Sequence, residues 1–481
     1  MSVTDLLDTA EAGPAAIRGS AFRIGGFVAG TLFGFAAFAL LARHLGVDDI
    51  GQYSVVVALV TVVGGLTDLG LTAIGVRELS TRTGAGRTHF ARNLLGLRLV
   101  LGIVGGIAMV GFVVLAGYDP TIVVGVALGA VGLLLTSWQS TLSVSLMSEL
   151  RLGWVTVVDL VRAMLGALFV LLLVVAGASL LPFLAITIPV GIVALALNAF
   201  VARRSGALLP AFHTADWRTL FADVLPYAVA AAAAAVYFQL AVIIVSLIAE
   251  PTDIGYFGVS SRVVQVMLVI PGLAVGAAFP IFARAARDDR ERLAYALGRV
   301  FEVSLLVGVL ISILLGIGAP IVIRLLGGPE FSAASPLLSI QAIGLAASFV
   351  GAGWSYGLLS LGRTRAILKI NLTALALGGA SVAVLVKLDG AEGAALGTAG
   401  GEVVLALLSA WALTRADRRL MPPLRVVPAV ALATVLASLT ALLGLPVLVT
   451  CVVAGAVYLV VVVALRAVPQ EVWQQLARRS A

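Results

Sequence analysis

The sequence has few of the residues on which metalloenzymes and disulfide-stabilised domains depend. Its 481 residues include one cysteine, Cys451, and three histidines, His44, His89 and His213. One thiol excludes a disulfide framework, and the scattered histidines lack the spacing of metal ligands. The chain also lacks a Gly-x-x-x-x-Gly-Lys-Ser/Thr motif, which excludes a nucleotide-binding loop of that type. We therefore expect no metal, no cofactor and no ATP-driven mechanism.

Charged residues are scarce as well. They make up 11% of the chain, against 61% hydrophobic residues, whereas a soluble domain carries about 25% charged residues. The net charge of +7 does not indicate a nucleic-acid partner, because the basic residues lie in short loops between apolar runs. The longest polar segment, about 20 residues, is too short for a catalytic domain.

What the chain does contain is a series of apolar runs, each long enough to cross a bilayer. A membrane helix needs about 20 apolar residues, and continuous runs of that length indicate helices rather than strands. The sequence thus predicts an all-α polytopic membrane protein with 14 transmembrane helices. The spans lie near 20–42, 50–72, 93–116, 121–146, 155–176, 180–201, 225–249, 253–279, 299–319, 334–359, 366–386, 392–413, 427–444 and 446–466.

The basic residues of the loops predict the orientation. Of 31 Lys and Arg, 27 fall on one side of the predicted spans and 3 on the other, and Arg262 lies inside a span. Basic loops remain in the cytoplasm. We expect the chain to be a multi-pass membrane protein with both termini in the cytoplasm.

An internal repeat suggests two lobes. Asp49-Ile50-Gly51-Gln52-Tyr53 and Asp253-Ile254-Gly255-Tyr256-Phe257 open the second and eighth spans, as in transporters built from repeated halves. The predicted organisation is a cytoplasmic segment 1–19, a first lobe 20–202, a cytoplasmic linker 203–224, a second lobe 225–415, two further helices within 416–466 and a cytoplasmic tail 467–481.

Several short motifs, taken in their order along the chain, resemble those of bacterial polysaccharide or oligosaccharide flippases. These flippases belong to the multidrug/oligosaccharidyl-lipid/polysaccharide exporter superfamily. The residues that carry the resemblance are Ala42-Arg43-His44-Leu45-Gly46, Gly51-Gln52-Tyr53, Asp68-Leu69-Gly70-Leu71, Arg77-Glu78, Leu225-Pro226-Tyr227, Gly255-Tyr256-Phe257 with Arg262, and Leu361-Gly362-Arg363.

This resemblance implies a fold, a substrate and partners. It implies two six-helix bundles around a central cavity, and export of undecaprenyl-diphosphate-linked oligosaccharide by alternating access for cell-surface polysaccharide biosynthesis. The expected partners are the lipid-linked oligosaccharide, the bilayer, and a polysaccharide polymerase with glycosyltransferases. The glycan and the coupling ion are not readable from these residues.

Charges inside spans are costly and usually functional. Arg262 lies nine residues into its span, or ~13 Å, where it either binds a diphosphate or belongs to a structural ion pair. Glu402 either pairs with Arg262 or couples transport to a cation. Arg23 and Asp68, at the ends of adjacent helices, form either a gating salt bridge or, through Arg23, a substrate contact.

Other polar and aromatic residues complete the predicted site. Asp159 and Arg162 have the i,i+3 spacing of a stabilising ion pair. Aromatic faces suit sugar rings and amides suit hydroxyls, although helix–helix hydrogen bonding remains the alternative for each. The remaining candidates for substrate binding are Tyr237, Gln239, Gln265, Trp138, Gln139, Trp354, Tyr356 and Asn371.

Three other functions stay open. A cation-coupled exporter of small amphipathic compounds would favour acids deep in the first and seventh spans, which hold none before Glu250. A membrane enzyme acting on lipid-linked sugar would need a large outer loop, and the predicted outer loops are short, so we expect no enzyme. A lipid scramblase or an assembly scaffold is the third alternative.

Overall fold

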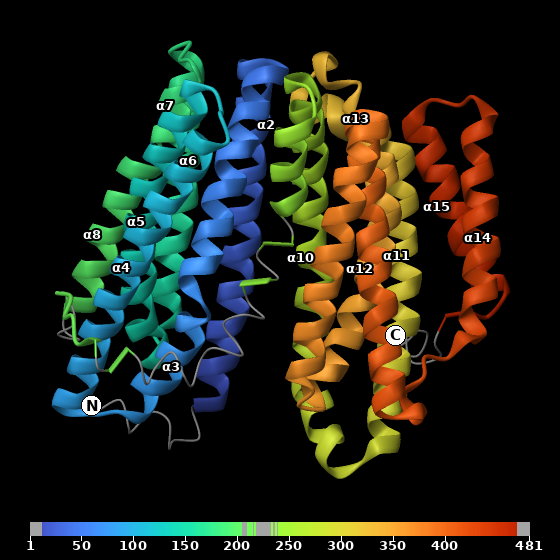
Figure 1. The fold of residues 1–481 in the computed structure, drawn as a ribbon. Coiled ribbons are helices and arrows are strands. Elements are labelled where there is room, and N and C mark those ends of the chain that lie inside the picture. The colour runs from blue at the N-terminus through green and yellow to red at the C-terminus, as the bar shows by residue number, and fades with distance from the viewer. Residues whose placement is uncertain are drawn as a thin grey trace. The chain divides into compact units, whose positions relative to one another are not determined.

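The computed structural model describes residues 12–203, 209–214, 216–217, 232–233, 236–237 and 239–468, and Figure 1 shows its ribbon. In this part of the chain all regular structure is helical. The chain forms two compact units, Met1–Gln239 and Leu240–Ala481.

Seven labelled helices build the first unit. They are α2 (Ala12–Asp68), α3 (Leu71–Thr81), α4 (Gly84–Leu115), α5 (Pro120–Ser148), α6 (Leu152–Val175), α7 (Leu180–Ala185) and α8 (Thr187–Ala202). The helix α2 packs along α6 and α5, while α4 packs against α5.

The second unit is built in the same way from long helices. They are α10 (Pro251–Asp288), α11 (Arg290–Gly327), α12 (Ala334–Ser360), α13 (Thr364–Ala416), α14 (Val427–Leu439) and α15 (Val447–Ala464). Short 3-10 turns lie at Pro329–Phe331, Arg418–Leu420, Leu424–Val426 and Thr440–Leu443. The α14–α15 hairpin packs on α11 at one side of this unit (Figure 1).

The helices confirm the predicted fold class. Among the described residues, eleven helical segments are long and apolar enough to cross a membrane. Two of them hold two predicted spans each, because α2 turns at Gly46 (φ 79°) and α13 turns at Asp389 and Gly390 (φ 51°). Glycine adopts these positive φ values at little cost. The span predicted near 225–249 lies partly outside the described residues, and within it the structure describes the helix Gln239–Ile248.

The span predicted at 180–201 is divided in two. The helix α7 ends at Ala185, and α8 begins at Thr187. Pro189 explains the break, since its ring would clash with the carbonyl of residue 185 in a continuous helix.

Glycines allow a close contact between two helices of the second unit. A Cβ atom added to Gly344 on α12 would lie 2.8 Å from Cα of Ala399 on α13, and one added to Gly351 would lie 3.3 Å from Cβ of Ala406. The backbones of α12 and α13 therefore approach closely over two helical turns. We call this contact the α12–α13 seam.

Candidate functional site: charges within the membrane helices

A charge cluster lies on exposed faces of the first unit. It contains Arg23 of α2 together with Asp159 and Arg162 of α6, and all three side chains are exposed. Both arginines attract Asp159, which also hydrogen-bonds the side chain of Gln139 on α5. The two α6 residues lie ~10 and ~15 Å along the helix from its start at Leu152. Exposed charges at that depth need a polar or aqueous surrounding.

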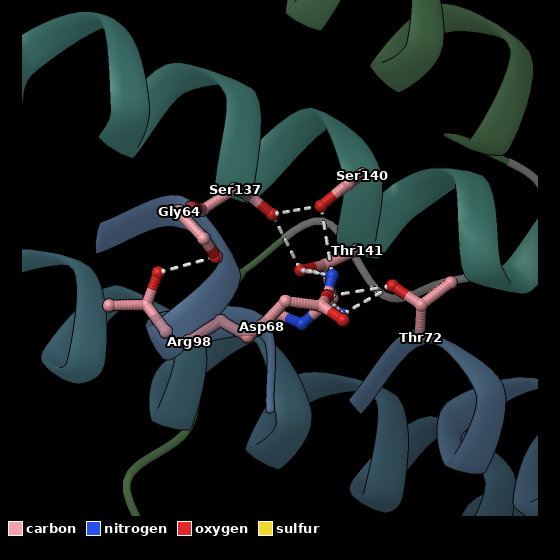
Figure 2. A network of polar contacts seen from close by, with 8 residues as sticks. Gly64, Asp68, Thr72, Arg98, Ser137, Ser140 and Thr141 are labelled. Atoms are coloured by element: carbon pink, nitrogen blue, oxygen red, sulfur yellow. Dashed lines mark hydrogen bonds and ion pairs between the residues drawn. The ribbon is translucent and has the colours of Figure 1, made fainter. Parts of the chain in front are cut away.

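A second network is buried between α2, α4 and α5 (Figure 2). The Arg98 side chain, 2% exposed, forms an ion pair with Asp68. One of its nitrogens also donates to Thr72 Oγ1 at 2.7 Å, and the other donates to Ser140 Oγ at 2.8 Å. Thr72 in turn donates to Asp68 Oδ1 at 2.8 Å. This network fixes the corner at which α2 ends and α3 begins.

The corner itself has an unusual backbone. Leu69 (φ 46°) and Gly70 (φ 71°) both adopt left-handed conformations, which for leucine costs about 1 kcal/mol. Because Asp68 and Thr72 flank these residues, the bonds to Arg98 hold the strained turn in place.

The structure corrects the predicted pairing of Asp68 with Arg23. The partner of Asp68 is Arg98, and the acid nearest to Arg23 in its charge cluster is Asp159. Arg98 lies near the start of the span predicted at 93–116, and the helix that carries it, α4, begins earlier, at Gly84. The serines and threonines of α5 are the signal that could have indicated a polar partner inside this unit.

In the second unit, Glu402 lies in the α12–α13 seam. Its carboxylate accepts a hydrogen bond from the Ser348 hydroxyl, one turn beyond Gly344 on α12. The position gives Glu402 a role in joining these two helices, beside the coupling role that the sequence suggests.

Arg262 and Gln265 lie one turn apart on α10, and both are partly buried. The neighbouring Ser261 accepts a hydrogen bond at 3.1 Å from Nε2 of Gln341 on α12. Gln341 is 4% exposed and Ser261 is 8% exposed. The polar surface around Arg262 on α10 is therefore fixed partly by α12.

The predicted aromatic residues fall into different surroundings. Trp354 is 9% exposed and stacks on Phe301 at 5.7 Å, so it is a core residue of the second unit rather than a free surface for a sugar ring. Tyr356 is partly buried and lies 5.7 Å from the ring of Phe279. Trp138 packs against the core between α5, α6 and α8.

The remaining predicted residues are amides and one phenol. Gln139 is buried, and its backbone carbonyl accepts a bond at 3.1 Å from Asn198 of α8. Gln239 is buried, whereas Tyr237 and Asn371 are partly buried. These residues belong to three regions of the chain. Of the four, Gln139 contacts the charge cluster of Arg23, Asp159 and Arg162, through its hydrogen bond with Asp159.

Comparison with protein families identifies the chain. A family model described as polysaccharide biosynthesis protein matches residues 16–286, which is more than half of the sequence. The chain belongs to this family. No curated protein matches its sequence.

Solved structures share the fold of this family member at low identity. The lipid II flippase MurJ in an inward closed conformation is similar with a TM-score of 0.77 and 14% identity, covering 92% of this chain and 98% of that one. An inward-facing multidrug resistance MATE family transporter of the MOP superfamily is similar with a TM-score of 0.70 and 13% identity, covering 81% and 95%.

A third structure extends the comparison to archaea. A MOP superfamily transporter from Pyrococcus furiosus has a TM-score of 0.58 and 15% identity, covering 84% of this chain and 96% of that one. The family and the fold confirm the predicted resemblance and the multi-pass membrane architecture. The fold is one that solved structures of a flippase and of transporters share.

Proposed function

We propose that this protein moves an undecaprenyl-diphosphate-linked oligosaccharide from the cytoplasmic to the outer leaflet of a bacterial inner membrane, for cell-surface polysaccharide biosynthesis. The proposed mechanism is alternating access of two lobes around a central cavity, with both termini in the cytoplasm. The matched family is one of polysaccharide biosynthesis, and the similar MurJ structure is a lipid II flippase. The asymmetry of the basic loops supports the orientation.

One observation carries the substrate class. Arg23 and Arg162 are exposed on membrane helices, and both attract Asp159, so these three described residues hold two cations and one acid. The cluster therefore has an excess positive charge on a surface where an isolated cation is costly. A diphosphate supplies the matching negative charge, and a guanidinium binds phosphate oxygens in a bidentate way.

The residues proposed to contact substrate divide by chemistry. In the first unit, Arg23 and Arg162 would bind the diphosphate. Arg262 of the second unit is a separate candidate for phosphate binding, and amides and aromatic residues would contact the glycan. This last group comprises the partly buried residues Gln265, Tyr237, Asn371, Trp138 and Tyr356, whereas Gln139 and Gln239 are as buried as Trp354 and would support the site from the core. Asp68, held by Arg98, would act in gating, and Glu402 in gating or coupling.

A second candidate function is cation-coupled export of small amphipathic compounds. The similarity to a MATE transporter favours it, with a TM-score of 0.70. The two functions differ in their response to loss of the arginines, since an exporter of small amphipathic compounds would have no diphosphate for Arg23 and Arg162 to bind.

The experiment that tests the proposal is complementation of a host that lacks its own copy of this protein. The double variant Arg23→Ala/Arg162→Ala should lose surface glycan at an unchanged protein level. Arg77→Ala is the matched control, because the Arg77 side chain is 69% exposed and pairs with Glu78 on α3. Normal surface glycan in the double variant would refute the assigned site.

A further inference from the structure

Part of the segment predicted as a linker, 203–224, belongs to the first unit and lies directly on α4. Asn93 of α4 is 5% exposed and uses its whole amide to hold residues of the linker. Its Nδ2 donates to His213 O at 3.3 Å and to Asp216 Oδ2 at 3.2 Å. Its Oδ1 accepts from His213 N at 3.0 Å and from Trp217 Nε1 at 2.8 Å. A buried amide with both groups satisfied is a specific contact.

Backbone contacts extend this attachment by one helical turn. Ala211 N donates to Arg92 O at 2.9 Å, and Arg92 Nε donates to Leu209 O at 3.2 Å. A Cβ atom added to Gly96 would lie 2.0 Å from Ala211 O. Glycine at position 96 therefore allows the linker backbone to touch the helix.

Side-chain contacts add to this attachment. His89 Nε2 lies 2.9 Å from Asp216 Oδ2, and the rings of His89 and His213 are 4.7 Å apart. Trp217 packs against the core cluster that contains Leu71 of α3 and Leu94 of α4. We call residues 209–214, Asp216 and Trp217 the docked segment.

The same part of α4 also binds two turns between helices of the first unit. Arg87 donates to Ser148 Oγ at 3.0 Å and to Glu149 Oε1 at 2.9 Å, at the turn from α5 to α6. Arg98 holds Asp68 at the turn from α2 to α3. Within twelve residues, Arg87 to Arg98, α4 thus binds the α2–α3 corner, the α5–α6 turn and the docked segment.

We propose that Asn93 and Gly96 form a permanent binding site on α4 for the docked segment, which we call the seat. The docked segment then moves as one body with the rest of the first unit. The joint that lets one unit move against the other then lies outside the docked segment. This conclusion concerns the mechanics of the chain and goes beyond the proposed substrate and direction of transport.

Hydrogen exchange tests the seat without any transport assay. In the purified full-length protein, the amide protons of Ala211 and His213 should be protected, since both are hydrogen-bonded. Asn93→Ala removes four bonds and should make exchange in the docked segment at least about tenfold faster. Asn198→Ala is the control, because Asn198 is also buried in the first unit but bonds to α5. Equal exchange in Asn93→Ala and wild type would overturn the proposal.

A reversible bridge tests whether the seat stays occupied during transport. His89→Cys and His213→Cys, in a Cys451→Ser background, would be joined by a short bis-methanethiosulfonate reagent. A permanent seat predicts the same glycan export before and after bridging, within about twofold. Inhibition that a reductant reverses would show that the segment must leave α4, and would contradict the proposal. An unbridged pair that is already inactive would be replaced by the pair His89→Cys/Asp216→Cys.

Discussion

The arginines within the membrane helices differ in their exposure. Arg98 is 2% exposed and surrounded by an acid and three hydroxyl groups, whereas Arg23 and Arg162 are exposed and both attract Asp159. A buried arginine with this many partners stabilises a corner of the fold. An exposed arginine at membrane depth has capacity left for an anionic ligand. This difference, which no sequence pattern reports, separates structural from substrate-binding candidates.

The buried network predicts unequal effects of its two charges. Asp68→Ala would leave the Arg98 guanidinium buried without its counter-charge and should lower the free energy of unfolding by about 3 kcal/mol. Arg98→Met leaves Asp68, whose side chain is 41% exposed, so its cost should be nearer to about 1 kcal/mol. Thermal unfolding in detergent would measure both, and equal losses would contradict this assignment.

Arg262 carries the strongest prediction about substrate binding. Arg262→Ala should abolish glycan export, while Arg262→Lys should retain part of it, because lysine keeps the charge but cannot bind a phosphate in a bidentate way. Surface glycan and protein level, measured together, check this expectation. Full export by Arg262→Ala would remove Arg262 from the site.

Among the helices, Gly344 in the α12–α13 seam has a matched control in Gly400, which lies on an exposed face of α13. Gly344→Ala would place a methyl group 2.8 Å from Cα of Ala399 and should cost about 1–3 kcal/mol. Gly400→Ala meets nothing within 4 Å and should be neutral or stabilise its helix by up to about 1 kcal/mol. Thermal unfolding of the two variants would distinguish them, and a neutral Gly344→Ala would argue against close backbone contact.

The helices were largely predictable from the sequence, and their lateral contacts were not. Apolar runs indicate membrane helices because the bilayer sets their length and requires backbone hydrogen bonds within each segment. The turns at Gly46 and Gly390 also fall between predicted spans. The amphipathic helix α3 was missed, since part of it lies in a short polar stretch. The role of α4 was missed because its partners Asp68, Ser148 and Asp216 are distant in sequence.

At the scale of the whole molecule, the fold defines the architecture, whereas particular side chains define the substrate. The fold is shared with MurJ over 92% of the chain at 14% identity, so most positions have diverged while the architecture remains. Substrate identity must then reside in particular side chains, and the fold alone does not define the glycan.

The proposed orientation of the chain in the membrane predicts which loops can be reached from outside the cell. Single cysteines placed at Arg77 and at Lys387, each in a Cys451→Ser background, should react differently with an impermeant thiol reagent added to intact cells. The residue at position 387 should be labelled from outside and the one at 77 only after lysis, because the basic loops are proposed to be cytoplasmic. The reverse pattern would invert the proposed direction of transport.

The most direct measurement is translocation of an undecaprenyl-diphosphate-linked oligosaccharide in proteoliposomes that contain only this protein. The account predicts that wild-type protein moves the labelled lipid between leaflets, and that Arg262→Ala and Arg23→Ala/Arg162→Ala do not. Vesicles in which the wild type moves none of the lipid under any imposed ion gradient, or in which the arginine variants move it equally well, would contradict the account.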